Sequence, residues 1–590
     1  MTLNNLIGLL QVDPTVGDLD GNAKRIEGLA NQAKLNGASV AVSTELAICG
    51  YPPRDLLLQS DFIKKAQKTA SELDVDLPVL VGTPIAAEND RQLPFNGVVL
   101  AGPNGGNTRG EGSSRLVAKK QLLPTYDVFD EARYFKADTR SGIARTIGGM
   151  DFGVTVCEDA WQAAGQTPSA YAADPIEHLA EWGRQGVELS ATVNLSASPF
   201  HSDKVSTRVH VSRTAAQILG HPFLLANQVG ANDDLLFDGC SLIAWPDGQV
   251  VIAPAWQEGV LLVDLDSPQN CRWIASELED SFCIGNDKIK HLSSDDDGHE
   301  DAEHLVEELA DAIVTGLSDY CRKSGICSIV LGLSGGIDSA VAACVAAAAV
   351  GADNVTAIAM PSRHSSQHSI DDAQYTATAL GLNFSIREID DLHKSVENSI
   401  GDILASGNPV ASENLQARLR AIIVMGHANA QGSMAIATGN KSELAQGYCT
   451  LYGDMAGGYT PLGDLYKMEV YALAELFNSR AIEAGKEAPI NQSTLTKPPS
   501  AELAPNQKDE DSLPAYPVLD AILKAHIEDG LDIQSITEMG FERKTVIEVL
   551  NRLEKNEHKR WQMSPAPRVS MRAFGQGWRH PLASKHTWRG

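Results

Sequence analysis

Short apolar runs alternate with amphipathic stretches along the first half of the chain. The runs have the length and composition of strands, and residues 22–35, between two of them, carry apolar positions at helical spacing. Strands that alternate with helices are typical of a layered α/β architecture. The predicted strands are 6–12, 39–43, 78–82, 97–100, 116–119, 153–157, 189–194, 222–227, 240–244 and 260–265.

The second half repeats this alternation. Apolar side chains recur at helical spacing over 305–320 and lead into an apolar run at 329–333. This order predicts a doubly wound parallel sheet, whose ligand lies at the carboxyl ends of the strands. Further strands are predicted at 354–360, 383–389 and 432–438, with a helix over 370–380.

A polar and charged segment, 286–302, joins the two patterns and has little to bury. It predicts a linker between a domain at 1–285 and a second domain at 303–590. Its adjacent aspartates, 295–297, lack the loop-forming spacing of a metal site, so we interpret them as a solvated connection.

The composition narrows the class of protein. The 590 residues contain 48 Lys plus Arg against 76 Asp plus Glu, and a net charge of −28 argues against a broad nucleic-acid surface. Nine cysteines without a Cys-x-x-Cys pair argue against a disulfide framework or zinc ribbon and for a reducing compartment. We expect no signal peptide, and the longest apolar run, 340–350, is shorter than the ~20 residues of a membrane span. A cytoplasmic protein with no nucleic-acid or membrane partner is therefore expected.

A glycine-rich turn predicts a phosphate site in the second half. The apolar run 329–333 is followed by Ser-Gly-Gly-Ile-Asp at 334–338 and by a predicted helix at 339–350. Glycines let the backbone approach an anion closely, and the helix N-terminus offers free N–H groups and a positive dipole end. The Walker pattern Gly…Gly-Lys-Ser/Thr is missing, so ordinary NTP hydrolysis is not implied. The turn resembles the pyrophosphate-binding loop of ATP-dependent amidating and adenylating enzymes, such as NAD, GMP and asparagine synthetases.

Two acidic residues predict a metal site beside this turn. Asp338 and Glu443 both fall where predicted strands end. Paired carboxylates next to a triphosphate suit Mg²⁺, which bridges phosphate oxygens and neutralises their charge. Lys467 and Lys497 are candidates for the remaining anionic charge, although either one could equally be a surface lysine.

Three reactive residues follow predicted strands in the first half. Glu45, Lys120 and Cys157 could converge on one pocket, because ligand sites of α/β folds collect at strand ends. Cys157 precedes two acids, Glu158 and Asp159, whose charges would raise the pKa of its thiol. Lys120 could hold the thiolate and stabilise an oxyanion, while Glu45 moves the thiol proton to the leaving ammonia. Taken singly, a buried cysteine is more often packing and a lone Lys or Glu is more often solvated.

The strings around these three residues resemble the nitrilase superfamily, most closely its glutaminase branch that is fused to NAD synthetases. They are 44–57, 120–131 and 156–161, and the departures from the pattern, at Thr44, Cys49 and Arg54, touch none of the three. The resemblance implies an αββα sandwich with Glu45, Lys120 and Cys157 as catalytic residues. It also implies a glutamine pocket lined or supported by Tyr126, Glu131, Ser198 and Lys204.

Residues 438–467 resemble the active site of NAD synthetases, whereas GMP and asparagine synthetases do not share this pattern. The segments 414–420, 497–503, 507–514 and 574–576 extend the match across the second half. The resemblance implies an ATP-pyrophosphatase type of domain, with Mg²⁺ on Asp338 and Glu443. The implied ATP contacts are Ser334, Gly335, Gly336, Asp338, Ser339, Thr438 and Lys467. The implied deamido-NAD contacts are Arg418, Glu443, Asp454 and Lys497.

Together the two resemblances imply an ATP-dependent amidation of deamido-NAD to NAD with glutamine as nitrogen donor, through an adenylate. The products would be NAD, AMP, pyrophosphate and glutamate. Ammonia is mostly protonated at neutral pH, so a protected route between the sites is expected. The proline-rich, charged segment 495–511 is expected to order over bound substrate. The resemblance also suggests a homo-oligomer.

Three other functions remain open on the sequence. The chain could be an amide hydrolase whose second domain only senses ATP, although Asp338, Glu443 and Lys467 argue against this. It could be a non-catalytic nucleotide-binding scaffold, although both reactive sets are complete. A different amidating synthetase is the nearest alternative of the same class.

Overall fold

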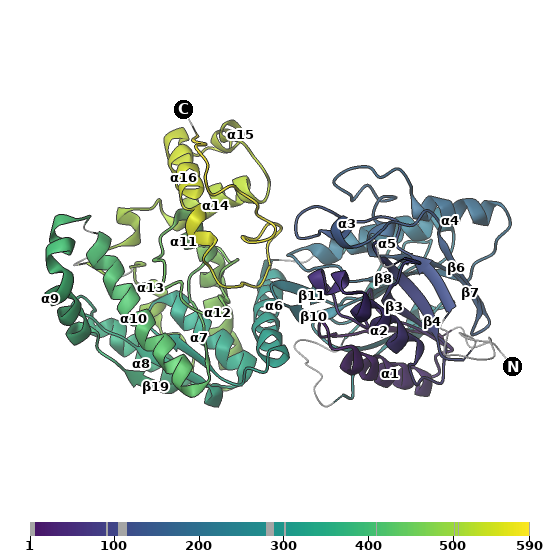
Figure 1. Cartoon of the computed structure of the whole chain (residues 1–590), viewed down its shortest axis with the longest axis horizontal. Helices are drawn as coiled ribbons and strands as arrows, with labels where there is room; N and C mark the ends of the chain where they lie inside the picture. Colours follow the sequence, from purple (N-terminus) through teal and green to yellow (C-terminus); the bar gives the residue numbers. More distant parts are fainter. Residues whose placement is uncertain are drawn as a thin grey trace. The chain divides into compact units, whose positions relative to one another are not determined.

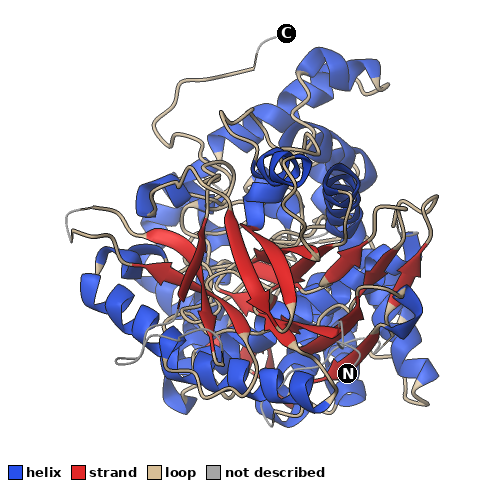
Figure 2. Cartoon of the chain, turned by 90° about the vertical axis from the view of Figure 1, so that its right-hand side faces the viewer, coloured by secondary structure: helices blue, strands red, loops and turns tan. Residues whose placement is uncertain are grey.

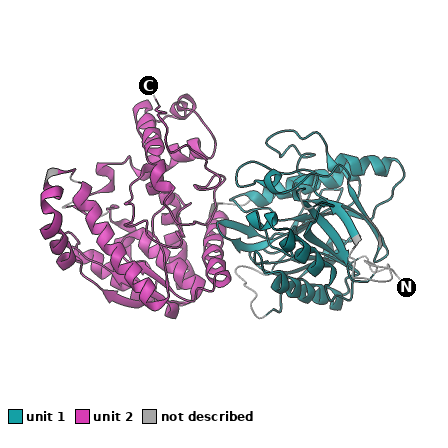
Figure 3. Cartoon of the chain, in the orientation of Figure 1, with its two compact units in different colours: residues 1–301 teal, residues 302–590 magenta. Residues whose placement is uncertain are grey.

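The computed structural model describes residues 6–89, 92–103, 115–278, 288–299, 302–408, 410–500, 502–504 and 507–588. It divides into two compact units, Met1–Asp301 and Ala302–Gly590 (Figure 3). The segment predicted as a linker, 286–302, contains strand β16 (Lys290–Leu292), which pairs with β13 (Val250–Ile252). That part therefore belongs to the first unit. The sequence did not reveal β16, because a short edge strand that is largely exposed has the same polar composition as a linker.

Two seven-stranded sheets form the centre of the first unit, with strands inside and helices outside (Figures 1 and 2). The first has the order β15-β14-β1-β2-β3-β4-β5 and the second β16-β13-β12-β9-β8-β7-β6. The first sheet contains β1 (Leu6–Gln11), β2 (Val40–Val42), β3 (Val79–Ile85), β4 (Phe95–Ala101), β5 (Arg115–Lys119), β14 (Gly259–Asp264) and β15 (Arg272–Ala275). The second contains β6 (Gly142–Ile147), β7 (Met150–Val156), β8 (Ala191–Ser196), β9 (Phe223–Asn227), β12 (Leu242–Ala244), β13 and β16. A separate hairpin is formed by β10 (Val229–Asn232) and β11 (Leu235–Asp238).

The alternation of side chains along the strands builds three apolar layers. In β1, Leu9 packs in the core between the two sheets, whereas Leu10 faces the core beneath α1 and α2. A third core lies between the second sheet and α4 and α5. The predicted αββα sandwich is thus confirmed. The helical segments of this unit are α1 (Leu19–Leu35), η1 (Arg54–Leu58), α2 (Ser60–Ser71), α3 (Glu131–Tyr134), η2 (Cys157–Ala160), α4 (Pro175–Arg184), α5 (Lys204–Leu219) and η3 (Pro268–Asn270).

The second unit contains a parallel sheet in the order β19-β18-β17-β20. The chain moves outward from β17 to β19 and then returns to the other side of β17, so the switch point of the sheet lies beside β17. The strand predicted at 432–438 is shorter than expected, because after Ala435 the backbone makes only an isolated bridge from Ile436 to Tyr459. The strands are β17 (Ile329–Gly332), β18 (Val355–Ala359), β19 (Asn383–Ile386) and β20 (Met434–Ala435).

Helices pack around this sheet and form a further cluster toward the C-terminus. Helix α10 packs on β17 and β18 through Val424 and Ala428, and α7 contacts α6 and α12. Around the sheet lie α6 (Ala302–Lys323), α7 (Ile337–Val350), η4 (Ala352–Asn354), α8 (Gln367–Leu380), α9 (Asp390–Ser406), α10 (Val410–Gln431), α12 (Lys467–Glu483) and α13 (Gln492–Thr496). The remaining segments are α11 (Lys441–Gln446), η5 (Asp509–Asp511), α14 (Tyr516–Ile527), α15 (Ile533–Glu538), α16 (Arg543–Lys555) and α17 (Glu557–Arg560). Among the helices of the described residues, none has both the length and the apolar character needed to cross a membrane.

Candidate functional site

Cys157 lies in a sharp turn at the end of β7. Its backbone has φ +45°, a left-handed value that is unusual for a non-glycine residue, and η2 begins at the same position. The side chain is buried, and the Cys157 carbonyl accepts a hydrogen bond of 3.2 Å from the Asn194 amide. A strained backbone at a reactive residue persists only where its surroundings hold it. The thiol is therefore held in place by the fold.

Lys120 and Glu45 form a buried ion pair in the same unit. The Lys120 Nζ lies 2.7 Å from Glu45 Oε1 and 2.8 Å from Glu131 Oε1, and none of the three side chains is appreciably exposed. Glu45 Oε1 also accepts from the Asn96 amide at 2.7 Å, while Glu45 Oε2 accepts from the Ala197 N–H at 3.1 Å. The lysine thus lies between two carboxylates whose positions are fixed by hydrogen bonds. The sequence predicted that Glu45 and Lys120 could lie in one pocket, because both follow predicted strands.

The charges of this cluster act on Cys157. Burial raises the pKa of the Cys157 thiol well above its ordinary value, the Glu45 carboxylate raises it further, and Lys120 opposes both. Burial alone would lower the pKa of Lys120, but Glu131 and Glu45 outweigh it and raise that pKa well above the usual range. Burial raises the pKa of Glu131 to about 7, against the stabilising charge of Lys120. The cationic lysine is thus the group that favours the thiolate.

Replacing Glu131 with glutamine is expected to speed alkylation of Cys157 by iodoacetamide. The thiolate is the reactive form, and removing a nearby negative charge lowers the thiol pKa. We expect an increase of roughly three- to tenfold at pH 8, where Glu131 is mostly ionised. The gain should shrink toward pH 6, where the wild-type Glu131 is itself mostly protonated. Mass spectrometry of the peptide that contains Cys157 measures the rate separately from the exposed Cys327. If the ratio of the Cys157 alkylation rates of Glu131→Gln and wild type does not change with pH, the charge of Glu131 does not control the thiol pKa.

The four residues predicted for a glutamine pocket have varied partners in the structure. Tyr126 donates to both oxygens of Glu158 at 3.0 Å, and the Lys204 ammonium lies 4.3 Å from the centre of the Trp161 ring. Ser198 is buried and its N–H donates to Asn227. Glu131 holds Lys120 as described above.

Several polar residues of this site were missed in the sequence. Asn96 binds Glu45, the Tyr51 hydroxyl donates to Glu131 at 3.0 Å, and the Tyr171 hydroxyl donates to Glu158 at 3.2 Å. Glu158, expected only to raise the Cys157 pKa, also accepts from two tyrosines. Among them only Tyr51 could have been found in the sequence, because two prolines follow it in the string 44–57.

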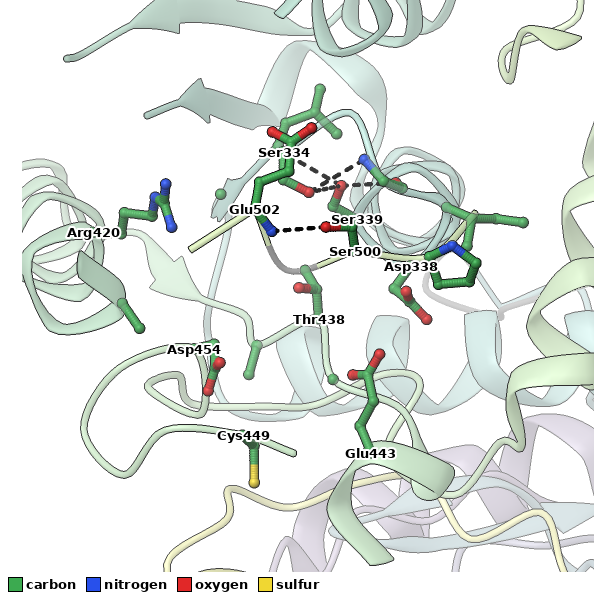
Figure 4. Close-up of a pocket in the computed structure, with 18 of the residues that line it drawn as sticks. Ser334, Asp338, Ser339, Arg420, Thr438, Glu443, Cys449, Asp454, Ser500 and Glu502 are labelled. Atoms are coloured by element: carbon green, nitrogen blue, oxygen red, sulfur yellow. Dashed lines mark hydrogen bonds between the residues drawn. The ribbon is translucent and has the colours of Figure 1, made fainter. Parts of the chain in front are cut away.

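A pocket of about 320 Å³ lies at the carboxyl end of β17 in the second unit, beside the switch point of the sheet (Figure 4). In this view Asp338 and Glu443 lie on one side of it, and Arg420 and Asp454 on the other. The predicted residues that line it are Ser334, Gly336, Asp338, Ser339, Thr438, Glu443, Asp454, Lys467 and Lys497. Gly335 and Arg418 do not line it.

The turn before α7 is held by its own serines. The Ser334 N–H donates to Ser339 Oγ at 3.2 Å, the two hydroxyls are 3.1 Å apart, and the Gly336 N–H donates to Ser334 Oγ at 3.2 Å (Figure 4). Gly335 has φ +78° and lies against the backbone of Ser369. Gly335 therefore has a packing role and is not part of the pocket lining, because no side chain would fit between it and Ser369.

Gly335→Ala is expected to destabilise the second unit strongly. A Cβ at this position would lie 2.1 Å from the Ser369 carbonyl oxygen, and φ +78° is itself unfavourable for alanine. Gly381→Ala is a matched control, because Gly381 has φ +74° with no atom within 4 Å of the added Cβ. We expect a loss of about 1–2 kcal/mol in unfolding free energy for the control and about 3 kcal/mol or more for Gly335→Ala, measured by denaturant unfolding. Equal losses would show that backbone conformation alone matters.

Lys467 lies between the two acids predicted to hold a metal. Its Nζ is 2.5 Å from Asp338 Oδ2 and 3.4 Å from Glu443 Oε1. Burial raises the pKa of Glu443 to about 8, and the charge of Asp338 adds to this effect. Two repelling carboxylates beside a pocket fit a hard divalent cation. Within the described residues no cluster of three or more His, Cys, Asp and Glu side chains is arranged to hold a metal alone, so ligand oxygens would have to complete the set.

The other charged residues of the pocket lie on α10, in the turns after α11 and on the segment after α13. Burial raises the pKa of Asp454 to about 6, and its Oδ1 accepts from the Thr450 N–H at 2.7 Å. Arg420, which the sequence did not single out, lines the pocket and donates to the Met360 carbonyl. Arg418 is exposed and donates to the Leu451 carbonyl instead. Lys497 pairs with Asp372 at 3.0 Å.

The segment predicted to cover the substrate contributes to the pocket lining. Its residues 498–500, 502, 503 and 509 line the pocket. Glu502 accepts from the hydroxyls of Ser366 and Ser369 at 3.1 and 2.7 Å, and its own N–H donates to Ser500 (Figure 4). The segment 495–511 is thus attached to the start of α8 through Glu502.

Comparison with known proteins identifies both halves of the chain. The family described as Carbon-nitrogen hydrolase matches residues 6–274, and the family described as NAD synthase matches residues 305–563. The glutamine-dependent NAD(+) synthetases of Synechocystis sp. and Thermotoga maritima are 38% and 37% identical, each over 98% of both chains. The structure of the Acinetobacter baumannii glutamine-dependent NAD(+) synthetase in complex with ADP is similar, with a TM-score of 0.70 and 32% identity over 98% of each chain. The chain therefore belongs to the family of glutamine-dependent NAD(+) synthetases.

Proposed function

We propose that this protein converts deamido-NAD to NAD with ATP, using ammonia released from glutamine. The first unit would hydrolyse glutamine at Cys157. The second would activate the nicotinate carboxylate of deamido-NAD and transfer the ammonia to it. The products would be NAD, AMP, pyrophosphate and glutamate.

In the glutaminase step the Cys157 thiolate attacks the side-chain amide of glutamine. Glu45 takes the thiol proton and gives it to the departing nitrogen, so ammonia leaves and a thioester remains. Lys120 stabilises the negative charge that develops on the carbonyl oxygen, since Glu45 and Glu131 keep it protonated. Water, activated by Glu45, then releases glutamate and restores the thiol. Tyr126, Ser198 and Lys204 are proposed to hold the rest of the glutamine.

In the synthetase step the nicotinate carboxylate attacks the α-phosphorus of ATP, and pyrophosphate leaves. Ammonia then attacks the adenylated carboxyl carbon, and AMP departs with the carboxylate oxygen. The turn at 334–339 offers hydroxyls and N–H groups to the phosphates, with Thr438 and Lys467 beside it. Asp338 and Glu443 would hold Mg²⁺, which neutralises charge on the phosphate oxygens as pyrophosphate forms. Asp454 and Lys497 are proposed to contact deamido-NAD, and Arg420 fits this role better than Arg418 because it lines the pocket.

One observation carries this proposal. A single chain contains a buried Cys-Lys-Glu cluster in one unit and, in the other, a phosphate turn facing two carboxylates. Neither an ATP-sensing amide hydrolase nor a non-catalytic scaffold requires both the Cys-Lys-Glu cluster and the two carboxylates at the phosphate turn. The test is to incubate the protein with deamido-NAD, ATP, Mg²⁺ and glutamine and to follow NAD, AMP and glutamate. Equimolar formation of all three supports the proposal, and glutamate release without NAD would favour the amide hydrolase.

Three further expectations accompany the proposal. We infer that the protein acts in the cytoplasm as a homo-oligomer that uses only small-molecule substrates. Sedimentation equilibrium measures the oligomeric state, and a monomer at micromolar concentration would contradict it.

A further inference from the structure

One buried carboxylate joins the chain segments that carry Lys120 and Cys157. Asp159 Oδ1 accepts from the N–H groups of Gln121 and Leu122 at 2.9 and 2.8 Å, and Oδ2 accepts from the Val156 N–H at 3.1 Å. The Asp159 side chain is buried, with 1% of the residue exposed. Three N–H donors from two separate segments thus converge on a single side chain.

Each of these donors flanks a residue of the proposed glutaminase chemistry. Gln121 and Leu122 directly follow Lys120, and Val156 directly precedes Cys157. Cys157 adopts φ +45°, a conformation that the surroundings must enforce. Burial raises the pKa of Asp159 to about 7, so its carboxyl is mostly ionised at pH 8. Hydrogen bonds to an ionised acceptor are stronger than neutral ones and fix geometry better. Asp159 therefore closes the turn at the thiol and attaches it to the lysine segment.

We propose that Asp159 is a positioning residue that sets the placement of the Cys157 sulfur relative to the Lys120 ammonium. This inference rests on the proposed function of the first unit as a glutaminase. Asp159 touches no reacting atom and acts through the backbone of its two neighbours. Errors of about 1 Å in such placements can reduce turnover by 10²-fold.

The neighbouring acid, Glu158, provides a matched control of opposite sign. Burial raises the pKa of the Cys157 thiol most, and the carboxylates that add to this effect include Glu158. Among the hydrogen bonds of the described residues, the Glu158 carboxylate accepts only from the hydroxyls of Tyr126 and Tyr171. Removing its charge should favour the thiolate. Removing the Asp159 carboxylate also removes a negative charge, but it should disfavour the thiolate on balance, because the thiol loses its alignment with Lys120.

The experiment compares Asp159→Asn with Glu158→Gln in the full chain. Asparagine keeps one acceptor oxygen but places an NH₂ donor against an N–H group in either orientation. We expect alkylation of Cys157 by iodoacetamide at pH 8 to slow by at least about fivefold in Asp159→Asn and to accelerate in Glu158→Gln. For Asp159→Asn the kcat with glutamine should fall at least about tenfold while the KM for glutamine changes by less than about threefold. NAD formation from ammonia should stay within about twofold of wild type.

The alternatives give distinct results. If Asp159→Asn alkylates as fast as wild type or faster, Asp159 does not position the thiol. If kcat falls only in proportion to the fraction of folded protein, judged by thermal unfolding, its role is structural. The alkylation rates do not depend on turnover. If wild type fails to release glutamate from glutamine, the proposed function fails, while the alkylation comparison still decides the alignment.

Discussion

Cys157→Ala is expected to abolish NAD formation from glutamine and to leave NAD formation from ammonia nearly unchanged. The thiol is the only group in the proposed mechanism that can form the acyl intermediate, so the loss should reach at least ~10³-fold. Ammonia supplied at alkaline pH bypasses this step. Its use should stay within roughly twofold of wild type, because the pocket that takes it belongs to the other compact unit. Separate assays of NAD with glutamine and with ammonium chloride measure the two rates.

Cys240→Ala provides the control for this experiment. Cys240 is buried in the same unit and has φ +50°, close to the φ +45° of Cys157. Both substitutions therefore remove a buried thiol from a left-handed backbone position. The control should keep both activities. Loss of ammonia-dependent synthesis in a folded Cys157→Ala protein would count against two separable sites.

The central parts of both sites could be predicted because they depend on local rules. Strand ends collect ligand residues in α/β folds, which brought Glu45 and Lys120 to one cluster 2.7 Å apart. A glycine turn between a strand and a helix can bind an anion through its backbone, which predicted that Ser334 and Asp338 would lie at a ligand pocket. Neither inference needed the long-range arrangement of the chain.

Residues that depend on register and rotation could not be predicted in this way. Asn96 looks like an ordinary polar residue in an apolar strand, and only the pairing of β4 with β3 brings it to Glu45. Arg418 and Arg420 are two positions apart on α10, and such positions point to nearly opposite sides of a helix. A motif that contains both cannot show that Arg420 lines the pocket. The sequence likewise could not separate the adjacent glycines: Gly336 lines the pocket, whereas Gly335 packs against the backbone of Ser369.

Asp338→Asn is expected to have the complementary effect, a loss of NAD formation with either nitrogen donor. Asparagine has nearly the same shape, so it can keep the contact with the Asn440 side chain, which lies 2.8 Å from Asp338 Oδ1. It removes the charge that pairs with Lys467 and that would bind Mg²⁺. Metal stabilisation of the transferring phosphate contributes several kcal/mol, so synthesis should fall by about 10²- to 10³-fold. The hydrolysis of glutamine, which is assigned to the other compact unit, should persist.

A magnesium titration distinguishes a metal ligand from a merely structural acid. If Asp338 binds the ion, half-maximal synthesis in Asp338→Asn should require a higher Mg²⁺ concentration, because one anionic oxygen ligand is lost. Asp353→Asn removes the same charge from an exposed position in the same unit and should change neither rate nor metal dependence. An Asp338→Asn protein with a reduced rate but an unchanged Mg²⁺ requirement would assign Asp338 to the placement of Lys467 instead. In that case Glu443, whose pKa is raised by burial and by the charge of Asp338, would have to bind the ion without Asp338.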